Sequence, residues 1–272
     1  MAVNNTWNAI TDTLVNTAAS PPWSAGTAPA NSEVILFPDG NSFSALGASL
    51  TSVDLAEMIV ARGYSGAIGS SGTPLTISSN LVRMYGSGSL YYTDGGGTTD
   101  LLIVDAASPS TVVHLGGATF TTVILLRGAL TINGTVTNLR VGTHSGTNAD
   151  ATCVINSGGG IATNIYQYSG SVTSSSGTAH TVWNIAGGSA TRNTGGAITN
   201  LTVGAGANMV YKSTSTMASA DVGPRGTLDL SQVQGALTIT ELIEHPQSVV
   251  RGAKESGLIT ITKRWELGDA TP

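Results

Sequence analysis

The sequence repeats Ile161-Ala162-Thr163-Asn164-Ile165 as Ile198-Thr199-Asn200-Leu201-Thr202-Val203, and two further copies precede them. Those copies are Phe120-Thr121-Thr122-Val123-Ile124 and Val136-Thr137-Asn138-Leu139-Arg140-Val141. Each copy has an apolar residue, a small polar pair and another apolar residue, and glycine or Asn-Gly precedes it. The polar pairs begin at residues 121, 137, 163 and 199, so the spacings are 16, 26 and 36. A degenerate fifth copy, His180–Ile185, divides the last spacing.

Repeats of this length, with short strands and glycine corners, predict a short right-handed parallel β-helix, that is, a β-solenoid. One coil cannot bury its own apolar residues, but stacked coils form a continuous core. In this interpretation Val123, Leu139, Ile165 and Leu201 occupy equivalent core positions. A β-sandwich of irregular hairpins remains open as the alternative fold, because it also uses short strands with turn signals.

The composition favours a folded β protein with a neutral surface. Only 10% of the 272 residues are charged, whereas 40% are hydrophobic. Between Asp150 and Asp221 the only charged residues are Arg192 and Lys212. The chain has no cluster of Lys and Arg, so we expect no nucleic-acid partner. We also expect no membrane partner, because no apolar run approaches the length of a membrane span.

The first part of the chain predicts an arm and a cap. Residues 1–50 are expected to form an extended N-terminal docking arm, with a short amphipathic helix before Pro21-Pro22. Residues 51–63 give the strongest helix signal, with capping-box spacing from Thr51 to Asp54 and Gly63 as the stop. We expect this α-helix to cap the open end of a solenoid that spans residues 51–222.

The composition changes again near the C-terminus. Charged residues return after Pro224-Arg225-Gly226, and two segments, Leu237–Thr240 and Leu258–Thr262, largely alternate as half-buried strands do. Residues 223–272 are therefore predicted to form a C-terminal β cap or assembly region.

Residues with catalytic chemistry are scattered, so we expect no catalytic, cofactor-binding or metal site. Asp100 and Asp105 are the only carboxylate pair that suggests glycoside cleavage. Aspartates at strand ends usually serve as turn residues. The four histidines lack metal-ligand spacing, and the single Cys153 sits in an apolar segment as a small buried residue. The protein is therefore expected not to be an enzyme and to carry no cofactor.

In style the chain resembles virion proteins of tailed bacteriophages, which include capsid decoration proteins, head fibres and tail spikes. The resemblance lies in the Gly/Ser/Thr-rich coils, the arm and the low charge, and it supplies no residue-by-residue correspondence. It implies a homotrimer located on the virion, at the capsid surface, and made in the host cytoplasm.

Three function hypotheses from different classes follow. The first is a structural virion protein, a capsid decoration or cement protein that binds the major capsid protein or another virion protein. Its arm would dock through Trp7, Ile10, Leu14 and Trp23, although these side chains could instead fold back on the chain's own core.

The second hypothesis is a tail fibre or tail spike that recognises a host surface glycan. Tyr166, Tyr168, Trp183 and Tyr211 would then stack on sugars, or would pack in the core or between subunits. A polysaccharide-cleaving enzyme is a third reading, and it requires a carboxylate pair in a groove.

Overall fold

The computed structural model describes residues 3–11, 13–14, 22–46, 49–93, 95, 98–117, 119–143, 150–252 and 257–268. The fold is a parallel β-solenoid of about 10 turns, and none of the described residues is helical. This result confirms the predicted solenoid and excludes the antiparallel sandwich, because every pairing between described strands is parallel. The chain divides into two compact units, Met1–Thr137 and Asn138–Pro272.

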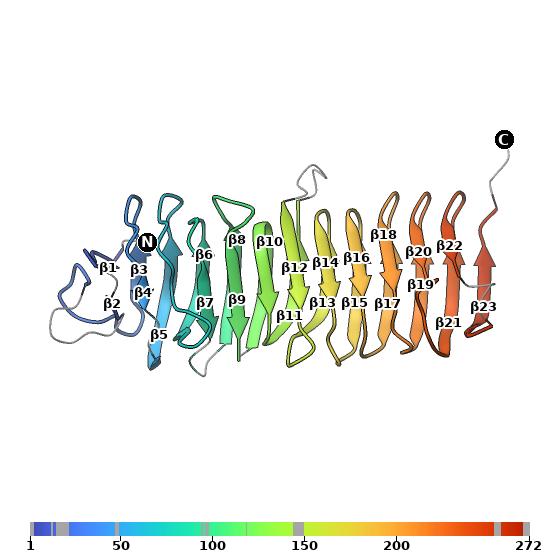
Figure 1. Ribbon diagram of the computed structural model, residues 1–272, viewed down its shortest axis with the longest axis horizontal. Coiled ribbons are helices and arrows are strands. Elements are labelled where there is room, and N and C mark those ends of the chain that lie inside the picture. Colours follow the sequence, from blue (N-terminus) through green and yellow to red (C-terminus); the bar gives the residue numbers. More distant parts are fainter. Residues whose placement is uncertain are drawn as a thin grey trace. The chain divides into compact units, whose positions relative to one another are not determined.

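In the first unit the strands of successive coils lie side by side (Figure 1), and their parallel pairings form two columns. Their bounds are β1 (Asn5–Thr6), β2 (Thr13–Leu14), β3 (Val34–Phe37), β4 (Ala45–Leu46), β5 (Ser49–Val60), β6 (Leu75–Met84), β7 (Leu90–Thr93), β8 (Thr98–Asp105), β9 (Val112–Gly116) and β10 (Thr119–Ile132). One column runs through β3, β5, β6, β8 and the first half of β10. The other column contains β7, β9 and the second half of β10.

The core of the first unit is an in-register column of apolar side chains. Ile35, Met58, Val82, Leu102 and Val123 follow one another through the paired strands, and each is fully buried. β10 belongs to both columns, because its pairing register shifts after Leu125 and its second half pairs with β9. These contacts explain why Val123, one of the predicted core residues, is inaccessible to solvent.

The predicted capping helix over residues 51–63 is wrong, because residues 51–60 lie in strand β5 (Ser49–Val60) and residues 61–63 form a turn after it. β5 pairs on both sides, with β3 through Met58 and with β6 through Leu55 and Met58. Leu55, Met58 and Val60 are all fully buried. Burial of these three side chains is therefore compatible with a strand and does not require a helix. Pairing with two neighbouring strands therefore overrides the local helix signal.

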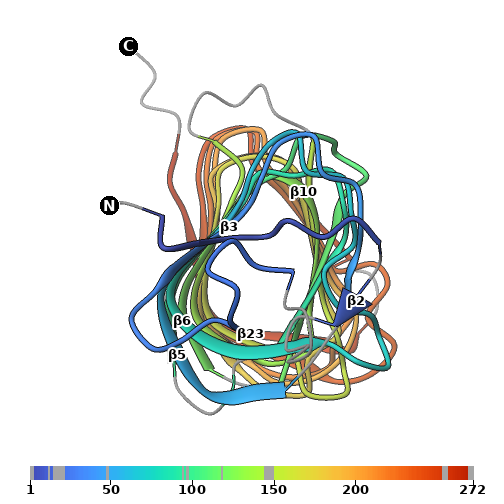
Figure 2. The ribbon, with the colours of Figure 1, turned by 90° about the vertical axis from the view of Figure 1, so that its left-hand side faces the viewer.

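The N-terminal segment, rather than a helix, covers the first coil. β1 adds to β3, and the backbone N–H of Trp7 donates to the Leu36 carbonyl over 2.8 Å. Trp7 and Trp23 pair through an antiparallel bridge. Seen from this end, the dark-blue N-terminal chain crosses the ring outlined by β5 and β6 (Figure 2). The expected helix before Pro21 is absent from residues 3–11 and 13–14, and its remaining residues up to Pro21 lie outside the described ones.

The second unit follows β11 (Thr135–Val141), which runs across the division between the units. Its strands alternate between two columns, and each strand pairs with the strand after next. Their bounds are β12 (Ala151–Ile155), β13 (Ile161–Gln167), β14 (Ser171–Ser174), β15 (His180–Ile185), β16 (Ser189–Arg192), β17 (Ile198–Val203), β18 (Asn208–Tyr211), β19 (Met217–Val222), β20 (Thr227–Asp229), β21 (Leu237–Glu244), β22 (Val249–Arg251) and β23 (Ile259–Glu266).

The repeat pattern corresponds to one register position in this unit. Ile165 pairs with Trp183, Trp183 with Leu201, and the position continues through Ala220 to Leu242. All of these side chains are at most 1% exposed. The predicted equivalence of Ile165 and Leu201 is confirmed, and the degenerate copy lies between them as expected.

The apolar column ends at charged residues in the last strand. Arg264 of β23 is the register partner of Leu242, and its Nε lies 2.5 Å from Glu244 Oε1 and 3.1 Å from Glu266 Oε1. Charges that point inward at a sheet end disfavour further strand pairing. The last described strand therefore has a different chemistry from the coils before it.

Candidate functional site

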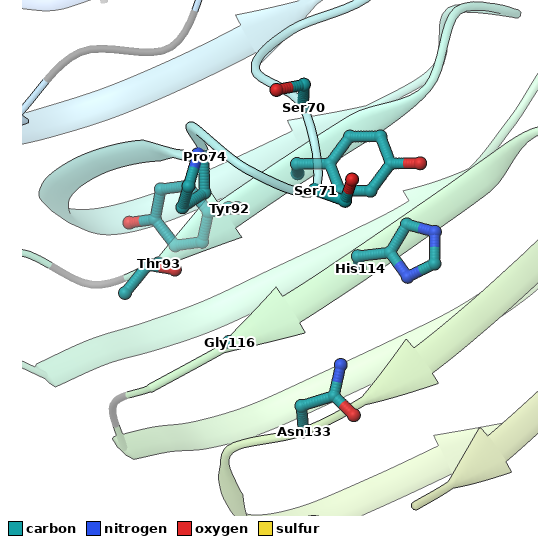
Figure 3. A pocket seen from close by; sticks show the side chains of 9 residues that line it. Ser70, Ser71, Pro74, Tyr92, Thr93, His114, Gly116 and Asn133 are labelled. Atoms are coloured by element: carbon teal, nitrogen blue, oxygen red, sulfur yellow. The ribbon is translucent and has the colours of Figure 1, made fainter.

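The first unit carries a surface hollow beside strands β7 and β9 (Figure 3). Its volume is about 220 Å³. A loop that leaves the coil after Ile68 forms one wall, and residues of three successive coils form the rest. The lining residues are Ser70, Ser71, Pro74, Tyr91, Tyr92, Thr93, His114, Gly116 and Asn133.

The loop wall is held by its own hydrogen bonds. The Ser70 N–H donates to the Thr73 carbonyl over 3.0 Å, and the Ser70 and Thr73 hydroxyl oxygens lie 2.9 Å apart. Gly69 enters the loop at φ +66°, where a Cβ would lie 2.7 Å from both Leu75 N and Tyr91 O. The turn therefore requires glycine, and the loop sits tightly against β7.

A stacked pair of rings forms part of the wall. Tyr91 and His114 are register partners on β7 and β9, with ring centroids 4.3 Å apart and an interplanar angle of 14°. Both side chains are half-buried. Burial lowers the pKa of His114 below its ordinary value of 6.5, so the imidazole is uncharged at neutral pH.

The hollow is therefore suited to an uncharged ligand. Its lining offers ring surfaces, hydroxyl groups and the Asn133 amide, and none of the described residues that line it is Asp, Glu, Lys or Arg. Sequence reasoning noted only that the four histidines, His114 among them, lack metal-ligand spacing. It missed the pairing of Tyr91 with His114. The shared apolar-x-apolar pattern of Leu90–Tyr92 and Val113–Leu115 aligns the two residues only once β7 and β9 are known to pair.

Two further hollows lie on the second unit, at the turns that follow β16, β18 and β20. One has a volume of about 620 Å³ and the other about 420 Å³. Asn193, Thr194, Lys212 and Gln234 line both of them. Their walls are polar and contain no aromatic ring, so they lack the flat apolar surface that the hollow on the first unit provides.

A buried polar cluster in the second unit has the residue types of a nucleophilic pair. Ser174 Oγ lies 2.9 Å from His180 Nε2, and Arg192 Nη1 lies 2.5 Å from Ser174 Oγ and 2.7 Å from His180 Nε2. His180 Nδ1 lies 2.5 Å from the Ala162 carbonyl, so it donates and leaves Nε2 as the acceptor.

Electrostatics and burial give this cluster a structural role. Burial and, after it, the Arg192 charge lower the pKa of His180 to about 4, so the ring is neutral at pH 7. Burial also lowers the pKa of Arg192 to about 10, which leaves its charge intact at neutral pH. All three side chains are fully buried, so a substrate cannot reach the Ser174 hydroxyl in this conformation.

The predicted docking residues of the arm fall into different environments. Trp7 and Trp23 are 0% and 3% exposed and pack on Phe37, with ring centroids 5.7 and 5.6 Å from it. Ile10 is 82% exposed. The backbone of Leu14 pairs with Leu46 in the β2–β4 ladder, and its side chain lies outside the described structure. The two tryptophans thus form part of the chain's own core, whereas Ile10 is available to a partner.

The exposed large apolar side chains of the described residues gather near the two termini. No residue of this kind falls between Leu46 and Val249 among the described positions. The N-terminal set is Val3, Ile10, Phe43 and Leu46, and the C-terminal set is Val249, Leu258, Trp265 and Leu267.

The other candidate residues do not form a site. Trp183 and Tyr211 are fully buried, so they cannot stack on a sugar, whereas Tyr166 and Tyr168 are half-buried. Asp105 pairs with Arg62 over 2.7 Å. Asp100 lies five residues away on β8, about 16 Å in an extended strand and beyond the roughly 6.5–9.5 Å of an inverting glycosidase pair. Cys153 is buried as predicted, and burial raises the pKa of its thiol.

No family model, curated protein or solved structure matches this chain. Within the described part of the chain, no group of three or more His, Cys, Asp or Glu residues is arranged to hold a metal ion. The described residues also contain no helix long and apolar enough to cross a membrane.

Proposed function

We propose that this protein is a structural component of a virion, a capsid decoration or cement protein that binds the particle surface. One observation carries the proposal: among the described side chains, the strongly exposed large apolar ones are confined to the terminal regions, while those of the coils between them are at most partly exposed. Large apolar side chains supply affinity in protein interfaces, and neutral polar surfaces supply little. The protein therefore has defined docking regions on an otherwise inert scaffold.

The N-terminal set is the surface we assign to the particle. Asn41 Nδ2 donates to the Ala9 carbonyl over 3.1 Å, and β2 pairs with β4, so the segment around Ile10 runs beside the segment around Phe43 and Leu46. The Trp7–Trp23–Phe37 cluster anchors this segment to the first coil. A rigid support lowers the conformational entropy lost when Ile10 docks.

The C-terminal set is the surface we assign to self-association as a homotrimer. Trp265 is 54% exposed, and its indole Nε1 donates to Glu241 Oε1 over 3.0 Å, which fixes the ring on the outer face. Among the described pairings, β23 pairs with β21 alone, so Trp265 lies on the strand that ends the described stack.

Mass spectrometry of particles purified by density-gradient centrifugation tests the proposal. The chain should remain with intact particles at a fixed ratio to the major capsid protein, and antibody labelling should place it on the head surface. The proposal is wrong if the chain is abundant in the lysate and absent from purified particles.

A further inference from the structure

We propose that the hollow bordered by Tyr91, His114 and the Ser70–Pro74 loop is a binding site for a neutral pyranose ring, either as a free sugar or as a glycan residue. The proposal concerns a surface of the first unit that is separate from the apolar docking set. It holds whether or not the chain is part of a virion.

The size of the hollow limits the ligand. Its volume of about 220 Å³ lies below the roughly 300–1,000 Å³ of clefts that hold drug-sized ligands. A single six-membered ring with its hydroxyl groups suits this space better than an extended peptide or a nucleotide. The hollow is open to solvent along one side, so further sugar residues could continue outward.

The chemistry of the walls selects a ligand with one apolar face and several hydroxyl groups. The C–H groups on one face of a pyranose can pack on an aromatic ring, whose face carries partial negative charge. Tyr91 and His114 offer such surfaces, and each fixes the other because they stack at 4.3 Å. Stacking of two half-buried rings holds them in place before a ligand arrives.

Hydrogen-bonding groups surround the rings. Figure 3 shows His114 between Ser71 of the loop and Asn133 of a later coil, with Thr93 at the other side of the hollow. Hydroxyl and amide groups can donate to and accept from sugar hydroxyls. Since none of the described lining residues carries a charged side chain and the His114 ring is neutral at pH 7, these residues offer an anionic sugar no ion pair to offset its desolvation.

Saturation-transfer NMR with the full-length protein tests the proposal. The probes are the methyl glycosides of glucose, galactose and mannose, N-acetylglucosamine, short neutral oligosaccharides, and N-acetylneuraminic acid as the anionic comparison. We expect saturation transfer to the ring C–H protons of at least one neutral probe and none to N-acetylneuraminic acid. Equal signals for monosaccharides and oligosaccharides indicate that one ring suffices, whereas signals for oligosaccharides alone indicate that a glycan chain is required.

Three variants locate the binding. Tyr91→Ala removes a ring surface and should weaken binding roughly tenfold or more. Ser71→Trp places a large side chain over the hollow from an exposed loop position, so it should block binding without disturbing the core. Tyr166→Ala is the matched control, since Tyr166 is also half-buried but lies on β13 of the second unit, outside the hollow.

The proposal is overturned by either of two results. One is that no neutral probe gives saturation transfer with the wild-type protein. The other is that binding survives Ser71→Trp in a variant whose circular dichroism matches the wild type. If Tyr91→Ala fails to fold, the Ser71→Trp result alone decides. A protein that binds sugar but is absent from particles refutes the virion proposal and leaves this one standing.

Discussion

The terminal regions and the coils between them contain the same kind of strand, but they differ in how far their apolar side chains are exposed to solvent. In the middle coils, the positions that point inward are apolar, as at the position shared by Ile165 and Leu201, and the large apolar side chains described on the outer face are only partly exposed. In the terminal regions, apolar residues such as Ile10 and Trp265 face solvent, at 82% and 54% exposure. The difference shows that burial within the coils provides stability, and in our proposal the exposed apolar groups near the termini bind partners.

The largest expected effect is the difference in stability loss between substituting a core phenylalanine and substituting an exposed one, both in the N-terminal region. Phe37 is fully buried at the centre of a ring cluster: its ring centroid lies 5.3 Å from that of Tyr64, and it contacts both tryptophans. Phe37→Ala should therefore lower the free energy of unfolding by about 3–5 kcal/mol. Phe43 is 39% exposed, and Phe43→Ala should cost less than about 0.5 kcal/mol. Denaturant unfolding measures both. Similar costs for the two variants would mean that the aromatic cover is not packed on the first coil.

The next effect tests the register of the middle coils. Leu201→Ala opens a cavity between Trp183 and Ala220 and should cost about 2–5 kcal/mol. Leu267 is 47% exposed and serves as the control, with an expected cost below about 0.5 kcal/mol for Leu267→Ala. A surface-like cost at both Leu201 and the fully buried Leu139 would show that the register is wrong.

A third effect concerns the buried polar cluster and depends on pH. His180 has a pKa of about 4 in the folded protein against 6.5 unfolded, so between these values only the unfolded chain takes up the proton. Stability is therefore full above about pH 6.5 and falls as the pH drops towards 4, by about 3 kcal/mol in total. Unfolding measured across this range should show the slope in the wild type.

A variant of His180 assigns that slope. His180→Gln should flatten it, since no proton is then taken up at this position on unfolding. An unchanged slope in His180→Gln would remove the cluster as its source.

The smallest effect concerns a surface ion pair on the first unit. Arg62 lies 2.7 Å from Asp105, and the two side chains are 55% and 33% exposed. Solvent screens such a pair, so Arg62→Ala should cost less than about 1 kcal/mol, and less still at high salt. A cost comparable with that of Leu201→Ala would mean that this surface pair matters as much as the core.

The solenoid could be predicted because its signal is local and repeated. Each copy of the pattern places apolar residues at the same interval, and the degenerate copy at His180–Ile185 still aligned Trp183 with its neighbours. The β5 segment was mispredicted because Leu55, Met58 and Ile59 also have helical spacing. Only the pairing partners β3 and β6, which lie far away in the sequence, decide between the two conformations.

The cover of the first coil and the hollow depend on contacts that no local pattern reveals. Trp7 and Trp23 form an antiparallel bridge, and the rings of both pack on the ring of Phe37. The three residues come from separate stretches of the chain. The hollow exists because the Ser70–Pro74 loop leaves the coil beside Tyr91 and His114, which belong to different coils. Coil lengths differ along the chain, so sequence spacing alone does not align these residues.

The central claim, that the exposed N-terminal apolar set binds the particle, is tested most directly by adding purified variants to particles that lack the chain. Occupancy is measured by quantitative cryo-electron microscopy, and oligomeric state by light scattering. The account predicts that Ile10→Ser with Phe43→Ser yields a folded oligomer that no longer decorates particles. It predicts that Trp265→Ser with Leu267→Ser weakens the oligomer while single chains still bind. Full occupancy with the Ile10/Phe43 variant would contradict the account.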